Sequence, residues 1–335
     1  MSWLWSTAGV LLALLTVDVV LTTLGAGVRS GPVTGRLTRG LWRLLLVPWR
    51  RRGSTAAIQH AGPVLLIVVV LTWVVLLWLA WTLVFLAGDP AVQDATTGTG
   101  ADTAEVVYFV GFTVFTLGVG DYAATTDLWR ILTAVASFSG LFLVTLSITY
   151  LLNVVPAVVQ RRALAQQIHA MGTDAVALLR SGWDGQSFTG TFLEQLNNLT
   201  APLSQVGEQQ LAYPVLAYFR GSREHAALPV AAATLDDAML LLDEAVLPEA
   251  RPGDVPQSLR TLLAQLLNTS AMVRTGSEET TPPEPDLPAL RASGIPLREA
   301  GEVGRVVRDD PQRRELAAFV HGSGWPWPHG QAPAG

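Results

Sequence analysis

Apolar residues gather in three long stretches in the first half of the chain, each long enough to form a membrane-spanning helix. Residues 3–24 are apolar apart from Asp18, residues 63–87 carry no charge, and residues 131–160 run for thirty residues without one. Because about 20 apolar residues suffice to cross a bilayer, all three stretches predict transmembrane helices. A fourth apolar stretch, 106–115, is too short to span and predicts a re-entrant helix.

Charged residues between these stretches predict how the chain crosses the membrane. Seven Arg and no acidic residue lie in 25–62, and Arg161 and Arg162 follow the third stretch. Arg-rich segments stay on the cytoplasmic side by the positive-inside rule, so the acidic segment 88–105 faces outward. We therefore expect a multi-pass protein of the inner cell membrane, with its amino terminus outside and everything after residue 160 in the cytoplasm.

The basic segment 25–62 and the carboxylate of Asp18 each leave two interpretations open. Leucines recur in this segment at helical spacing near two Trp, which predicts an amphipathic helix at the cytoplasmic interface. A basic loop that only fixes the topology explains the charge equally well. Asp18 is a functional candidate because a charge within a span is costly. The simpler interpretation places it near the cytoplasmic end, paired with an Arg of residues 29–52.

From residue 161 the chain changes in kind and predicts a helical cytoplasmic domain. Residues 161–335 carry 14 Arg against 20 acidic residues, a formal charge of −6. Apolar residues recur at helical spacing, between Gly and Pro breaks, across 161–274. Thr234 suits the N-cap of the clearest of these helices. Residues 275–335 are rich in Pro and acidic residues, as in a linker, and predict a flexible tail with one short helix at 311–320.

The residue types that most enzymes need are missing or scattered. The chain has no Cys, and its five His show no paired spacing, so thiolate chemistry is excluded and a zinc or iron site is not supported. No strand followed by G-x-G-x-x-G indicates a nucleotide-binding domain. We therefore expect no enzyme activity, no organic cofactor and no nucleic-acid partner.

The strongest candidate site is the run Thr116-Leu117-Gly118-Val119-Gly120-Asp121, which follows the short apolar stretch. Consecutive carbonyls can point at one axis only when alternate residues take left-handed backbone angles, which glycine tolerates. Gly118 and Gly120 have this alternation. Thr116 adds a hydroxyl at one mouth, and Asp121 adds a carboxylate that attracts cations at the other. The short helix aims the negative end of its dipole at the same point.

This run resembles the selectivity filter of the potassium channel superfamily, and residues 63–160 resemble the pore module of its two-transmembrane members. The resemblance implies an all-α membrane fold with an additional amino-terminal span at 1–24. In that fold 63–87 is the outer helix, 106–115 the pore helix and 131–160 the inner helix. It also implies K⁺ ions bound by the carbonyls of residues 116–119 and by the threonine hydroxyl, within a filter of residues 116–120.

Two further positions match the pattern of the family's inner helix. Gly140 stands where a gating hinge is expected, although a glycine that only lets two helices pack closely is an equal alternative. Pro156 stands where a bend near the cytoplasmic gate is expected. The 1–24 helix carries no Arg and cannot sense voltage. Gating would therefore come from the 161–274 domain, through a ligand or partner that the sequence does not identify.

The run departs from the family's usual Thr-Val-Gly-Tyr-Gly at two places. Leu117 is a mild change, but Val119 lacks the aromatic ring that braces the filter. Phe112 and Phe115, on the pore helix, are positioned to supply some of that packing. Potassium selectivity is the leading prediction. A weakly selective or non-selective cation channel is the alternative, and a non-conducting membrane scaffold or sensor is the second alternative.

One filter run per chain predicts the assembly. A single loop offers carbonyls on one side only, whereas a bare ion needs them all round. We therefore expect a homotetramer closed by four-fold symmetry, in contact with membrane lipid.

Overall fold

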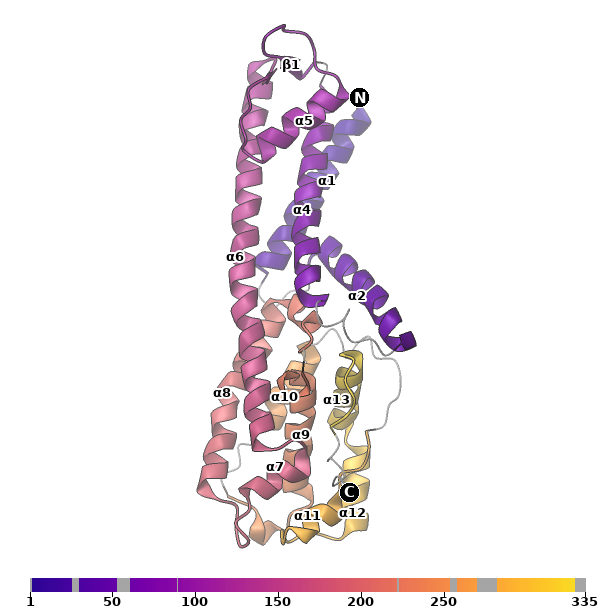
Figure 1. Ribbon diagram of the computed structural model, residues 1–335, viewed down its shortest axis with the longest axis vertical. Helices are drawn as coiled ribbons and strands as arrows, with labels where there is room; N and C mark the ends of the chain where they lie inside the picture. The colour runs from indigo at the N-terminus through magenta and orange to yellow at the C-terminus, as the bar shows by residue number, and fades with distance from the viewer. Residues whose placement is uncertain are drawn as a thin grey trace. The chain divides into compact units, whose positions relative to one another are not determined.

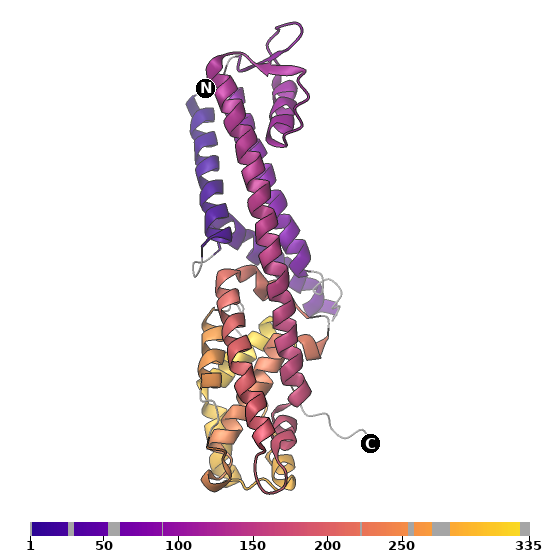
Figure 2. The same cartoon turned by 90° about the vertical axis from the view of Figure 1, so that its left-hand side faces the viewer.

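Helices make up most of the computed structural model, as Figures 1 and 2 show. The chain divides into two units, one comprising Met1–Val47 and Pro63–Val154 and the other Pro48–Gly62 and Val155–Gly335. The two units are described separately below. The structure describes residues 2–25, 30–52, 61–88, 90–221, 223–253, 258–269 and 282–328.

Among the described residues, three helices are long and apolar enough to cross a membrane: α1 (Ser2–Thr23), α4 (Ala61–Leu86) and α6 (Asp127–Met171). The three predicted spans are therefore confirmed as apolar helices. α6 runs eleven residues beyond the predicted end at 160, because Leu164, Ala165 and Ile168 continue its buried face and no helix breaker occurs before Gly172.

The basic segment forms a helix, α2 (Pro32–Arg52), which decides between the two interpretations left open above. Its buried positions, Thr34, Thr38 and Trp42, recur every four residues and so share one face. This spacing makes α2 amphipathic. Its predicted place at the membrane interface stays a prediction.

Asp18 binds the first turn of α2 and not, among the described side chains, an arginine. Its carboxylate is fully buried. It accepts hydrogen bonds from the backbone N–H of Val33 at 2.7 Å, the N–H of Thr34 at 3.0 Å, the Thr34 hydroxyl at 2.6 Å and Nε1 of Trp73 at 2.8 Å. The predicted ion pair is thus wrong for this part of the chain. Amide donors at the positive end of a helix dipole satisfy the charge instead.

The short helix predicted at 106–115 is α5 (Thr103–Val114), which begins three residues earlier than predicted. Asp102 caps it, and Glu105 returns the interaction to the Asp102 backbone, which is a complete capping box. Two short strands flank the loop, β1 (Val92–Asp94) and β2 (Tyr122–Ala124). They pair antiparallel with Asp94 opposite Tyr122, so residues on either side of α5 and the filter run are joined.

Aromatic side chains pack α5 against α4, which in turn packs against α6. The Phe85 ring lies 5.3 Å from that of Phe109 on α5 and 5.3 Å from that of Trp129 on α6. Trp81 on α4 donates to the Ser139 hydroxyl on α6 at 2.9 Å. Because Phe85 is fully buried, the pore helix is fixed within one chain.

The second unit is a helical domain built around α9 (Leu228–Glu244), which is buried along almost its whole length. Thr234 lies inside this helix, so its predicted role as N-cap is wrong. The helix begins six residues earlier, where Pro229 occupies the first turn without losing a hydrogen bond. α9 packs against α7 (Ala175–Gly182), α10 (Ser258–Thr269), α12 (Ala300–Asp309) and α13 (Pro311–Gly322). The unit also contains α8 (Gly190–Ala212), which packs against α10, and α11 (Leu287–Ala292), which packs against α7. Short 3₁₀ turns lie at Pro214–Tyr218, Glu224–Ala226 and Pro248–Ala250.

The predicted flexible tail at 275–335 is wrong for residues 282–328. α12 and α13 each bury an apolar face, formed by Val303 and Val307 on α12 and by Leu316 and Phe319 on α13. The short helix predicted at 311–320 is confirmed as α13. The high proline content led to the prediction of a flexible linker. The prolines at the start of α11 and α13, however, occupy first-turn positions, where proline fits a helix. Residues 275–281 and 329–335 lie outside the described residues.

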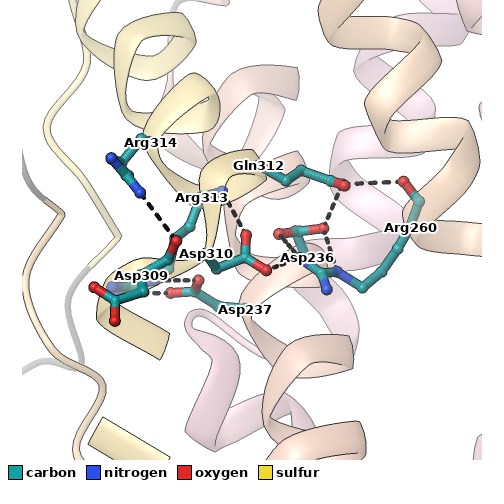
Figure 3. A network of polar contacts seen from close by, with 8 residues as sticks. All are labelled: Asp236, Asp237, Arg260, Asp309, Asp310, Gln312, Arg313 and Arg314. Carbon is teal, nitrogen blue, oxygen red and sulfur yellow. Dashed lines mark hydrogen bonds and ion pairs between the residues drawn. The ribbon is translucent and has the colours of Figure 1, made fainter. Parts of the chain in front are cut away.

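A buried polar network joins α13 to α9 and α10 (Figure 3). Arg313 is 1% exposed and pairs with Asp237 at 2.7 Å, and it also donates to the Pro283 carbonyl. Arg260 bridges Asp236 at 3.1 Å and Asp310 at 2.9 Å. These bonds tie the carboxyl-terminal helices to the core of the second unit.

Arg313→Ala is expected to destabilise this unit by about 3–5 kcal/mol, because it leaves the buried Asp237 carboxylate without its partner. Arg314→Ala, at the exposed neighbouring position, is the control and is expected to change stability by less than about 0.5 kcal/mol. Hydrogen exchange of the α9 amides in the full-length protein measures both. Equal protection in the two variants would contradict the role given to Arg313.

Candidate functional site

The filter run has left-handed backbone angles at every second residue. The angle φ is +58° at Thr116, +61° at Gly118 and +87° at Gly120. The alternation predicted from the glycines is therefore present and extends one step further, to Thr116. Thr116 is the one non-glycine residue with such an angle in the part of the chain that the structure describes. Strain of this kind at a non-glycine residue is typical of functional sites.

The run leaves the last turn of α5 without an intervening loop. The backbone N–H of Thr116 donates to the Thr113 carbonyl at 3.1 Å, and that of Leu117 donates to the Phe112 carbonyl at 2.8 Å. Both bonds hold the start of the run against the carboxyl-terminal end of the helix, where the dipole is negative. A cation beside Thr116 would face that negative end.

The side chains of the run have little cover within one chain. Leu117 is 69% exposed and Val119 is 54% exposed, and all residues from Thr116 to Asp121 are exposed. Both apolar side chains are therefore available for contact with another surface, such as a second copy of the chain.

Glu105 and Tyr122 form a brace that joins the two ends of the pore loop, and sequence reasoning missed both residues. One carboxylate oxygen of Glu105 accepts from the Asp102 backbone N–H at 2.7 Å, and the other accepts from the Tyr122 hydroxyl at 2.7 Å. The bond to Glu105 raises the pKa of Tyr122 to about 12. The available signal was Asp102-x-x-Glu105 before an apolar run, the pattern of a capping box. Tyr122 carried no such signal.

Phe112 and Phe115 pack into their own protomer. Phe112 is 6% exposed, with its ring 5.3 Å from that of Tyr108 and 5.2 Å from that of Phe109. The Phe115 ring lies 6.1 Å from that of Trp78 on α4. Phe112 therefore packs along its own helix, whereas Phe115, which is 41% exposed, makes a contact with α4. Their predicted packing against Val119 stays a prediction.

Gly140 lies where α6 passes the end of the pore helix. A Cβ atom at this position would stand 2.0 Å from the Val114 carbonyl oxygen, far closer than any side-chain contact allows. This close approach shows the packing role for Gly140, while the hinge role stays a prediction. Pro156 lies within α6, which continues as one helix on both sides of it.

Metal binding by side chains is not indicated in the described residues, since no group of three or more His, Asp or Glu is placed to hold an ion. The run itself offers backbone carbonyl oxygens and the Thr116 hydroxyl.

Two long apolar helices, a short capped helix between them and a strained glycine-rich run together define the pore module of an ion channel. Comparison with known families agrees, because residues 65–156 match the family described as "Ion channel". The chain is thus a membrane protein that carries, in this segment, the pore module of the potassium channel superfamily.

A curated relative extends the similarity beyond the pore module. The chain is 29% identical over 319 residues to the "Uncharacterized membrane protein YdjJ" of Bacillus subtilis (strain 168), which covers 92% of this chain and 91% of that protein. The shared length includes most of the second unit. No solved structure matches the chain significantly.

Proposed function

We propose that the protein is a potassium-selective channel whose filter is built from Thr116, Leu117, Gly118, Val119 and Gly120. The alternating left-handed angles at the carboxyl-terminal end of α5 carry this proposal. Such a backbone turns successive carbonyls to one side, where they replace the water shell of a K⁺ ion. Asp121 follows the run and concentrates cations at its outer mouth.

Four copies of the chain would close the ion path. Each chain supplies one run, and Leu117 and Val119 are exposed within it. A closed four-fold ring surrounds the ion with carbonyls. Light scattering of the detergent-solubilised protein tests this assembly. A protein mass of about 143 kDa, four times 35.8 kDa, is expected, and a monomer or dimer would contradict the four-fold pore.

Tracer flux into liposomes tests the function itself. Vesicles that contain the protein and an outward K⁺ gradient are expected to accumulate tracer K⁺ but little tracer Na⁺. Equal uptake of both ions would favour the alternative, a weakly selective cation channel. Uptake no greater than in empty vesicles would favour the second alternative, a non-conducting scaffold or sensor.

Val119 is the observation that favours the weakly selective alternative, since it offers no ring to brace the filter. Val119→Tyr is expected to raise the K⁺/Na⁺ permeability ratio several-fold, or to block conduction by overpacking beside Phe112 or Phe115. Leu117→Val is the control, because it restores a family residue without adding a ring. An unchanged ratio at unchanged conductance in Val119→Tyr would show that this position does not brace the filter.

The Glu105–Tyr122 brace is expected to stabilise the selective conformation of the run. Tyr122→Phe removes only the hydroxyl, and Glu105→Gln removes the charge and replaces one of the two acceptor oxygens with an NH2 group, which leaves one acceptor for the cap. Each is expected to lower the K⁺/Na⁺ permeability ratio. The interaction energy between the two residues in a double-mutant cycle is expected to be about 1.5–3 kcal/mol, the range for hydrogen bonds to charged groups. The double variant should then be no worse than the more severe single one. Additive effects would show that the two residues act separately.

Topology and gating complete the proposal. The amino terminus and the pore loop would lie outside and the second unit in the cytoplasm, as the arginine distribution predicts. α6 belongs to both units, with its residues divided between Val154 and Val155. A rearrangement of the second unit would therefore act on the inner helix directly, with Gly140 and Pro156 as the positions where the helix can bend.

A further inference from the structure

α2 presents a basic face for which the described residues hold no acidic partner. Arg36, Arg39 and Arg43 are all exposed and share one side of the helix at spacings of three and four residues. None of them forms an ion pair among the described side chains. Arg36 and Arg39 each donate one hydrogen bond to a carbonyl of their own helix, at 2.9 Å and 2.7 Å. A guanidinium has five donors, so most of this capacity is unused.

The start of this face lies at the end of a membrane span. α1 ends at Thr23, and Asp18, within its last two turns, holds Val33 and Thr34 in the first turn of α2. The ribbon in Figure 1 shows α2 running obliquely away from that end of α1. An amphipathic helix that begins where a span ends is expected to lie at the level of the lipid headgroups. The whole 25–62 segment has seven Arg and no acidic residue, so an anionic surface is its complement.

We propose that Arg36, Arg39 and Arg43 form a docking surface for the headgroups of anionic phospholipids, and that Asp18, Trp73 and Tyr150 relay its occupancy to α6. The attraction is electrostatic and accumulates over the three side chains. Phospholipid is the occupant because the surface continues directly from a span. The relay, unlike the docking surface, rests on the proposed channel function.

The relay is a continuous set of buried contacts within the first unit. Asp18 binds both the first turn of α2 and, at 2.8 Å, the Trp73 Nε1 of α4. Trp73 is fully buried, and its ring lies 6.2 Å from that of Tyr150 on α6, which is 3% exposed. Displacing α2 would leave a buried carboxylate short of donors, which is costly. A shift of α2 is therefore expected to carry α4 and α6 with it.

Lipid binding is tested without any measurement of conduction. The full-length protein in detergent is offered phosphatidylglycerol or phosphatidylcholine, and the bound lipid is counted by native mass spectrometry. A preference for phosphatidylglycerol is expected. The variant Arg36→Gln/Arg39→Gln/Arg43→Gln should lose up to about a hundredfold of this preference. The control, Arg291→Gln/Arg305→Gln/Arg314→Gln, removes the same charge from exposed positions elsewhere and should bind as the wild type does.

Two outcomes of this measurement would overturn the docking surface. One is an unchanged preference in the α2 variant. The other is displacement of phosphatidylglycerol by millimolar inorganic phosphate, which would show a general anion site with no requirement for lipid.

The relay is tested by tracer K⁺ flux in liposomes of increasing phosphatidylglycerol content. The wild type is expected to change its flux several-fold, and the α2 variant should respond weakly. Trp73→Phe removes the Nε1 donor and keeps most of the ring, so it should bind phosphatidylglycerol normally but lose the flux response. Asp18→Asn provides a second variant with the same expectation. A full response in Trp73→Phe would overturn the relay. Absence of flux in every vesicle, with lipid preference intact, would overturn the channel function and the relay but leave the docking surface standing.

Discussion

Gly120→Ala is expected to abolish potassium conduction while the assembled protein persists, and Gly118→Ala is expected to do the same. The two residues have φ of +87° and +61°. A Cβ atom at either position would meet no atom within 4 Å inside the chain, so the penalty within a protomer comes from the backbone alone. That penalty is about 1–2 kcal/mol per residue, and four chains around one ion path multiply it. The run is expected to relax toward ordinary angles, which turns carbonyls away from the ion.

A matched glycine outside the run separates this effect from general strain. Gly98 has φ of +67°, and a Cβ atom there would also meet no atom within 4 Å, but this residue lies in the turn between β1 and α5. Gly98→Ala should therefore carry a similar backbone cost and leave flux nearly unchanged. Tracer K⁺ flux and the mass of the solubilised complex are measured for all three variants. Normal flux in Gly118→Ala or Gly120→Ala would remove the filter assignment.

The spans and the pore loop were predictable because each is specified by a single continuous stretch of sequence. An uncharged apolar stretch lowers its free energy by leaving water, and one of about 20 residues or more is long enough to cross a bilayer. A Gly-x-Gly pair after a short helix has few conformations that use both glycines. Thr116 is different, because nothing in a threonine predicts a left-handed angle. Its conformation comes from the hydrogen bonds that hold the run against the end of α5.

The contacts that the sequence did not predict are those in which the partner is backbone or lies far along the chain. Asp18 was expected to find an arginine, but its partners are amides of α2 and an indole 55 positions away. Glu105 and Tyr122 are separated by the whole pore helix and filter. The carboxyl-terminal segment has a linker's composition, but Arg313 completes a buried pair with Asp237, 76 residues earlier. Composition cannot show such pairs, because each depends on the packing of helices that are distant in sequence.

Gly140→Ala is expected to reduce conduction at least tenfold and to lower the stability of the assembled pore. The added Cβ would stand 2.0 Å from the carbonyl oxygen of Val114 and 2.9 Å from its carbonyl carbon. Neither backbone atom can rotate away, so α6 or the end of α5 must shift. Overpacking of this kind costs about 1–3 kcal/mol or more in each chain. Because Val114 lies two residues before Thr116, the shift would reach the mouth of the filter.

The same substitution distinguishes the packing role of Gly140 from the hinge role. A packing glycine predicts that Gly140→Ala changes the K⁺/Na⁺ permeability ratio and lowers the melting temperature of the solubilised protein. A hinge predicts altered open probability with both of those quantities unchanged. Gly111→Ala, on α5, is the matched control. Its Cβ would meet the Trp78 side chain at 3.5 Å, which is an ordinary contact. If Gly140→Ala behaved like Gly111→Ala in stability and selectivity, the close approach of α6 to the pore helix would have no role in holding the filter.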